Sequence, residues 1–196
     1  MHPYSTQLWE RERVFIGLAI LSIGLSWSLY QILIVSSIEP PWWVGPPSVV
    51  SIYGFTLWVF DHFLWSHPWL GRLKVVGIPS FTGRWVGELS SSFDDYGSKI
   101  GLVIVIRQTW LRISIVLSTD SSSSKSQVAS LSLDDATDPA LSYQYLNDPQ
   151  GDSVAGLNIH RGTAVVVLEG ENLVGDYYTG RGRGNHGAFT ARKTQA

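Results

Sequence analysis

Cysteine is absent from this chain of 196 residues, and charged residues make up only 15% of it. The missing thiols exclude disulfide bridges and thiolate metal sites, and they are compatible with a reducing compartment. The charged share lies well below the usual quarter, which argues against disorder and indicates some surface that faces something other than water. A net charge of −2 argues against a binder of duplex nucleic acid, which needs a general excess of Lys and Arg.

Sequence patterns typical of catalysis are missing as well. The chain has no G-x-S-x-G, Walker or H-E-x-x-H motif. His160 and His186 have no nucleophile arranged beside them in the sequence. The acidic pairs Asp94-Asp95 and Asp134-Asp135 fall at predicted strand ends or turns, where solvated carboxylates are common. We therefore expect no enzymatic activity, no cofactor and no resident metal.

Long apolar runs are confined to the first third of the chain. From Val14 to Ile38, 25 residues pass without Asp, Glu, Lys or Arg. As a helix this run would be about 37 Å long, which is enough to cross a bilayer core. The alternative interpretation is a secretory signal peptide, but the run is longer than the apolar core of such a peptide. A second run, Pro47 to Trp65, predicts a transmembrane hairpin within residues 1–76, with spans of about 14–38 and 47–65.

The residues that flank the two runs predict an orientation. Arg11 and Arg13 precede the first run, Arg72 and Lys74 follow the second, and the short connection contains neither Lys nor Arg. The positive-inside rule then places both termini of this multi-pass protein in the cytoplasm. Tryptophans, which prefer the headgroup level, gather at both ends of the hairpin: Trp42, Trp43, Trp65 and Trp69.

Two features of the spans are candidates for membrane assembly. Gly17, Gly24 and Ser28, together with Ser22 and Ser26, form small-residue spacings of four and seven, and such a small face lets helices approach closely in lipid. The alternative is that Gly and Ser are simply common in membrane helices. Asp61 is an ionisable group within the second span and hence a functional candidate, unless it only reaches headgroup water.

From Gly77 onward the pattern changes to period-two alternation with β-branched residues, which predicts strands. We expect a mainly β domain over residues 77–196, an eight-stranded up-and-down antiparallel β-barrel, with a sandwich as the alternative. The run Ser121–Ser124 is expected to be a loop, and Trp85 a structural plug inside the barrel. The strands are predicted at 82–93, 99–108, 110–118, 127–134, 141–146, 159–169, 173–179 and 188–192.

The order of these parts resembles a known family. A double transmembrane hairpin is followed by a strand that begins within residues 78–87, IPSFTGRWVG, and the last strands contain residues 175–181, GDYYTGR. This combination resembles the SMODS-associating two-transmembrane, β-strand-rich effectors of bacterial cyclic-oligonucleotide antiphage signalling (CBASS). The resemblance covers nearly the whole chain.

The resemblance implies a function. It implies that the barrel senses a cyclic dinucleotide second messenger, made by a CD-NTase nucleotide cyclase as functional partner. Ligand binding would promote oligomerisation of the membrane segments, disruption of the bacterial inner membrane and abortive-infection cell death.

A cyclic dinucleotide needs cationic donors for two phosphates and flat aromatic faces for two bases. Residues 77–196 hold 10 Lys plus Arg against 12 Asp plus Glu, so a phosphate site must be a local concentration. On an extended chain Tyr177, Thr179 and Arg181 share one face, with Arg183 close behind. Gly175 on that face leaves space, although Arg181 to Arg183 could also be a plain surface turn.

Further candidates for this ligand lie on other strands. Arg107 and Trp110 flank a predicted turn. Arg107 could supply a cation and Trp110 a stacking plane for the ligand. The alternative is that Arg107 is an ordinary rim residue and Trp110 an aromatic residue of the core. Tyr143 shares a face with Tyr145, a pattern that a barrel core also produces. Two other functions stay open at this point: a membrane-tethered, lipocalin-like carrier of a small hydrophobic ligand, and a structural factor that docks other proteins.

Overall fold

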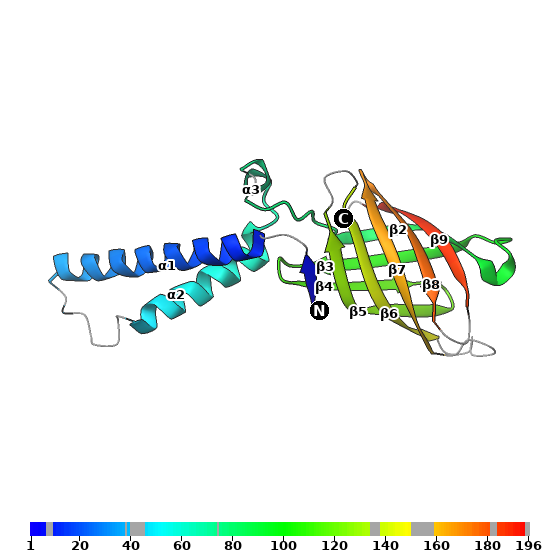
Figure 1. Ribbon diagram of the computed structural model, residues 1–196, viewed down its shortest axis with the longest axis horizontal. Coiled ribbons are helices and arrows are strands. Elements are labelled where there is room, and N and C mark those ends of the chain that lie inside the picture. Colours follow the sequence, from blue (N-terminus) through cyan, green and yellow to red (C-terminus); the bar gives the residue numbers. More distant parts are fainter. Residues whose placement is uncertain are drawn as a thin grey trace. The chain divides into compact units, whose positions relative to one another are not determined.

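A computed structural model describes residues 1–6, 10–37, 39, 46–73, 75–133, 138–149, 159–180 and 184–194. The chain forms two compact units. One unit consists of Met1–Gln7 together with Pro79–Ala196, and it is built of strands (Figure 1). The other, Leu8–Ile78, is helical.

The helical unit contains two antiparallel apolar helices. Its elements are α1 (Glu10–Val35), α2 (Pro46–Val59), the π-helical turn η2 (Phe60–Leu64) and the short α3 (Pro68–Arg72). The stretch Arg11–Val35 is long and apolar enough to cross a membrane, whereas the apolar helix that follows it is shorter. The Ser22 hydroxyl lies 3.3 Å from that of Thr56, and the Ser26 hydroxyl lies 2.8 Å from that of Ser48. These hydroxyls hydrogen-bond α1 to α2, which is how polar side chains join helices in an apolar setting.

The strand unit is a closed barrel whose strands follow the predicted alternation. Strands β2 to β9 pair in chain order, each antiparallel to the next, and β9 returns to β2 (Figure 1). Closure leaves no free sheet edge among them. Their bounds are β2 Gly83–Ser91, β3 Ile100–Gln108, β4 Arg112–Ser118, β5 Ser122–Ser132, β6 Ala140–Pro149, β7 His160–Glu169, β8 Asn172–Thr179 and β9 His186–Lys193.

A ninth strand in the described part of the chain corrects the prediction of eight. Strand β1 (His2–Thr6) lies between β4 and β5, antiparallel to the first and parallel to the second. The wall is therefore not antiparallel throughout. Because β1 pairs with residues more than a hundred positions away, no local alternation announces it, and Pro3 within it argues against a strand in sequence reading.

The prediction that Ser121–Ser124 forms a loop was also wrong for most of its length. Strand β5 begins at Ser122, and Ser122 to Ser124 pair with Asn147 to Pro149 of β6. Serine is a turn signal in sequence, but the ladder to β6 supplies these residues with main-chain partners and overrides that preference.

Apolar side chains fill one part of the barrel interior, which we call the apolar core. Trp85 is 1% exposed and its indole NH donates to the Phe81 carbonyl at 3.1 Å, so the predicted structural plug is confirmed. Gly83, Trp85 and Gly87 alternate on the inward side of β2. The apolar core consists of Phe81, Trp85, Ile104, Ile106, Trp110, Ile113, Ile115, Leu131, Leu141, Val166 and Leu173.

Candidate functional site

Polar side chains gather in a second part of the barrel interior, which we call the polar cluster. They stand on the inward-facing positions of four consecutive strands, β5 to β8, towards the end where β6 ends and β7 begins. None of the inward-facing residues in this described region is Lys, Arg, Asp or Glu. The polar cluster consists of Ser124, Ser126, Tyr143, Tyr145, Asn147, His160, Tyr177 and Thr179.

The strand registers bring these residues together across the wall. Tyr145 is paired with Ser126 on one side and Gly162 on the other. Asn147 lies between Ser124 and His160 in the next row. The rows therefore join hydroxyl, amide and imidazole groups from three strands, and these groups can donate and accept hydrogen bonds.

Two glycines leave room for the close approach of tyrosine side chains. A methyl group at Gly162 would collide with the Tyr145 ring, and one at Gly187 would come within 2.6 Å of the Tyr177 ring. Tyr143 and Tyr145 have ring centroids 6.2 Å apart, and Tyr145 contacts His160 edge to face at 6.5 Å.

The ionisation of one member is set by its surroundings. Burial, and to a lesser extent the neighbouring Tyr145, raises the pKa of Tyr143 well above its ordinary value of 10. At neutral pH its phenol keeps its proton and can donate a hydrogen bond to a ligand oxygen.

The predicted ligand residues on β8 have different surroundings. Tyr177 is half-buried on the inward side. The Thr179 hydroxyl donates to the Asn185 carbonyl at 2.9 Å and accepts from the Asn185 amide at 2.8 Å, so it fixes the β8–β9 connection. The space expected beside Gly175 is occupied by the Phe189 ring. Arg181 and Arg183 lie outside the described residues.

Two other predicted ligand residues are not part of the polar cluster. Arg107 is exposed on an outward-facing position of β3. Trp110 lies in the β3–β4 connection and is fully buried in the apolar core. The structure thus brings together Tyr143 and Tyr177, and it separates them from these two residues.

Sequence reading missed several members of the polar cluster. His160 looked isolated in sequence, and the serines of β5 were assigned to a loop. Asn147 was grouped with turn residues, although it is 7% exposed inside the barrel. Extending the alternation of β6 by one more position beyond Tyr143 and Tyr145 would have placed it on the inward face.

The candidates for membrane assembly occupy two different settings in the helical unit. Gly17, Gly24 and Ser28 lie on an exposed side of α1, and a methyl group at either glycine would meet nothing within 4 Å. Asp61 is 7% exposed within η2, with one carboxylate oxygen 3.4 Å from Nδ1 of His62.

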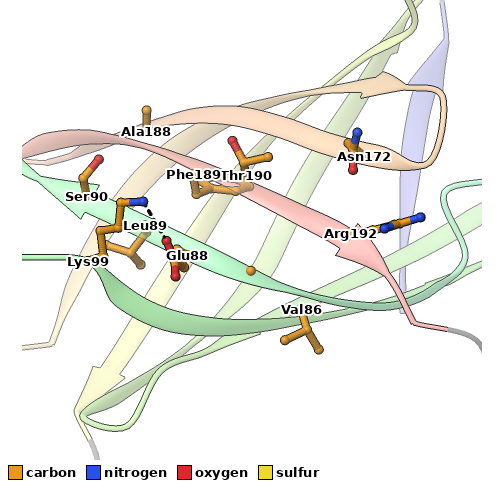
Figure 2. Close-up of a pocket in the computed structure, with 11 residues that line it drawn as sticks. Val86, Glu88, Leu89, Ser90, Lys99, Asn172, Ala188, Phe189, Thr190 and Arg192 are labelled. Carbon is orange, nitrogen blue, oxygen red and sulfur yellow. Dashed lines mark ion pairs between the residues drawn. The ribbon is translucent and has the colours of Figure 1, made fainter.

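A groove of about 500 Å3 lies on the outer wall of the barrel, over β2 and β9 (Figure 2). Its two cations are paired with carboxylates. Lys99 Nζ lies 3.1 Å from Glu88, and Arg192 Nη2 lies 3.3 Å from Glu171. The groove is therefore a poorer phosphate site than its lysine and arginine suggest.

The described residues contain no group of three or more His, Asp or Glu side chains placed to hold a metal ion. The chemistry of the polar cluster is that of a site for a neutral or anionic polar ligand with flat rings, because it offers hydrogen bonds and aromatic faces.

Comparison with known proteins agrees with this chemistry. The model of a family described as "Cap15, cyclic dinucleotide receptor domain" matches residues 76–193, which contain β2 to β9. CD-NTase-associated protein 15 of Yersinia aleksiciae is 30% identical over 151 residues, 76% of this chain and 70% of the relative. CD-NTase-associated protein 15 of Escherichia albertii is 23% identical over 139 residues, 68% of this chain and 69% of the relative.

Proposed function

The chain belongs to the family of Cap15 cyclic dinucleotide receptor domains, and from that premise we propose that it is a membrane-disrupting effector of CBASS. The resemblance found in the sequence is thereby confirmed at the level of the family. In this proposal residues 77–196 form the sensor, and the helical hairpin in residues 1–76 forms the part that acts on the bacterial inner membrane.

The polar cluster is the observation that supports the ligand site. Tyr143 and Tyr177 offer ring faces for the bases, and the amide of Asn147 can read a base edge. The phosphates need cations, which the inward positions of β5 to β8 lack. We assign them to Arg181 and Arg183, because Arg181 follows Gly180 directly after β8.

The helical unit supports two membrane crossings. The stretch Arg11–Val35 has the length and apolarity of a span. Residues 46–64 of α2 and η2 would extend about 28 Å at ~1.5 Å per residue, which is close to the thickness of a bilayer core. Two crossings would leave both termini on one side, and the flanking Arg11, Arg13, Arg72 and Lys74 would place that side in the cytoplasm.

Assembly would use the exposed side of α1. Ser22 and Ser26 face α2, which leaves Gly17, Gly24 and Ser28 for close packing against a second hairpin. A ligand can drive this assembly only as far as it binds the assembled state more tightly. A shift from 1:99 to 99:1 needs about 5.5 kcal/mol of differential affinity.

The test uses the full chain reconstituted in liposomes that contain a fluorescent dye. We expect cyclic di-AMP, cyclic di-GMP or cyclic GMP–AMP to bind, as measured by calorimetry, and to release the dye. Arg181→Ala should weaken binding at least tenfold, because it removes a charge-assisted phosphate contact. Arg107→Ala is the matched control and should bind normally, since Arg107 stands on the outer wall.

The same titration separates the carrier alternative. Trp85, Phe81 and Trp110 fill the apolar core and leave little room for an acyl chain, which argues against a lipocalin-like carrier. Saturable binding of a fatty acid with no response to the three cyclic dinucleotides would contradict the proposal. Arg181→Ala with unchanged affinity would remove only the assigned phosphate contact.

A further inference from the structure

Strand β1 interrupts a hairpin. Strands β4 and β5 pair directly only where Val116 to Ser118 face Ser123 to Lys125. Beyond that point β1 lies between them, with His2 against Ile113 of β4 and Tyr4 against Ala129 of β5 (Figure 1). The other eight described strands form a complete circle without it.

Ser126 stands where the β4–β5 ladder divides. Continuing the register of Val116 with Lys125 by one step would pair Ile115 with Ser126. Instead, the Ile115 amide donates to the Ser126 hydroxyl oxygen at 2.9 Å. The side chain thus takes the place of a main-chain acceptor at the point where β1 enters.

The hydroxyl of Ser126 can donate one hydrogen bond, and it donates that bond to His2 of β1. Nδ1 of His2 lies 2.9 Å from the Pro3 carbonyl, which can only accept, so Nδ1 is a donor. In the tautomer with its proton on Nδ1, Nε2 is an acceptor, and it lies 2.8 Å from the Ser126 hydroxyl. The hydrogen-bond network therefore assigns Ser126 as the donor to His2.

Ser126 is also a member of the polar cluster, opposite Tyr145. Ring nitrogens and carbonyl oxygens on the edge of a ligand base accept hydrogen bonds. If such an acceptor binds the Ser126 hydroxyl, it receives the hydrogen bond that Ser126 now donates to Nε2 of His2, and the contact between the β1 and β5 side chains is lost. This step links the ligand site to the strand that interrupts the wall.

We infer that β1 is a strand released by the ligand, and that its release transmits ligand binding to α1. The inference rests on the function proposed above. Only residues 7–9 separate Thr6 at the end of β1 from Glu10 at the start of α1. Once β1 leaves, β4 and β5 can extend their pairing, so the barrel keeps a closed wall of eight strands.

Two features of β1 favour its release. Pro3 has no amide hydrogen and cannot donate to the ladder. Tyr4 is its anchor, 3% exposed, but its hydroxyl donates to the Thr109 carbonyl at 3.4 Å and accepts from Gln108 at 3.3 Å. Both hydrogen bonds are long.

A disulfide that locks β1 in the wall tests the inference, and the chain has no cysteine of its own to interfere. Ser5 and Ser130 are neighbours on β1 and β5, both on the outer face. Adjacent strands lie ~4.8 Å apart, which suits a disulfide between Ser5→Cys and Ser130→Cys. The matched control joins Ser130→Cys to Ser142→Cys on β6 and leaves β1 free.

Both double variants are reconstituted as full chains, and disulfide formation is verified by thiol counting. With cyclic di-AMP, cyclic di-GMP and cyclic GMP–AMP as probes, we expect the oxidised Ser5–Ser130 variant to bind more weakly than the wild type, because ligand binding and the release of β1 are linked, and to release no dye. Reduction should restore release. The oxidised control should release dye normally. Where the first pair stays reduced, Pro3→Cys with Arg112→Cys provides a second lock on β4.

His2→Ala gives an independent test without a cross-link. Removing the acceptor for Ser126 should lower the probe concentration for half-maximal dye release about tenfold, the effect of one ordinary hydrogen bond. Dye release by the locked protein, or an unchanged concentration for His2→Ala, overturns the inference and leaves the proposed function intact. A wild type that binds none of the three probes overturns both.

Discussion

The apolar core and the polar cluster are built on the same wall by the same alternation of side chains, yet they differ in what they can do. The apolar core places bulky side chains such as Trp85 and Leu173 inward, where they are no more than 1% exposed. The polar cluster places tyrosines, serines and an asparagine inward, some of them beside glycines. Folding and recognition are thus assigned to different stretches of the same strands, so substitutions should separate them.

The largest effect is expected in the apolar core. Trp85→Ala removes a fully buried ring and should lower the free energy of unfolding by about 3–5 kcal/mol, measured by denaturant titration of the full chain in detergent. Val86→Ala is the matched control. The Val86 side chain faces outward on the same strand, and its loss should cost under about 1 kcal/mol. Equal losses at the two positions would contradict the assignment of Trp85 to the packed interior and Val86 to the outer wall.

The polar cluster should respond in binding more than in stability. Tyr177→Ala removes a ring face and should weaken cyclic dinucleotide binding by roughly 1–3 kcal/mol, or about 5- to 150-fold in Kd by calorimetry. Tyr178→Ala changes the next residue, whose ring is 58% exposed on the outer wall, and should bind normally. Tyr177→Phe should keep most of the affinity. A normal Kd for Tyr177→Ala would remove this ring from the ligand site.

Local patterns predicted the strands that pair with their neighbours in sequence. The period-two alternation between Gly83 and Lys193 predicted strands that overlap β2 to β9, although β5 begins five residues before its predicted start. Strand β1 depends on partners more than a hundred residues away and contains Pro3, so no window of sequence could reveal it. The serines at the start of β5 were mispredicted because of a local signal. Serine favours turns, but main-chain hydrogen bonding to β6 outweighs that preference here.

The candidate site was predictable only along single strands. Tyr143 and Tyr177 follow from alternation within β6 and β8, each read by itself. His160 and Ser126 become relevant only through register, since one pairs with Asn147 and the other with Tyr145. Register between strands is fixed by the barrel as a whole, which explains why a list drawn from sequence held Arg107 and omitted His160.

The smallest effect is expected in the β2–β3 connection. Its local structure is stabilised by hydrogen bonds from Ser98 to the carboxylate of Asp94. The Ser98 hydroxyl and the Ser98 amide, at 2.9 Å for the amide, donate to Asp94 and hold the pKa of that carboxyl below its ordinary value of 3.8. The stabilisation is present above pH 3.8 and is lost as the pH falls through the lower folded pKa.

Amide hydrogen exchange at Ser98 should therefore accelerate only below about pH 3.8, after correction for intrinsic rates, and unfolding of the barrel need not accompany it. Asp94→Asn keeps an acceptor oxygen but cannot titrate, so its exchange at Ser98 should show no such step. A step that persists in Asp94→Asn would assign the transition to another carboxylate. If amides in the apolar core accelerate their exchange at the same pH, the β2–β3 connection and the barrel interior unfold together. In that case the two regions would not be independent below about pH 3.8.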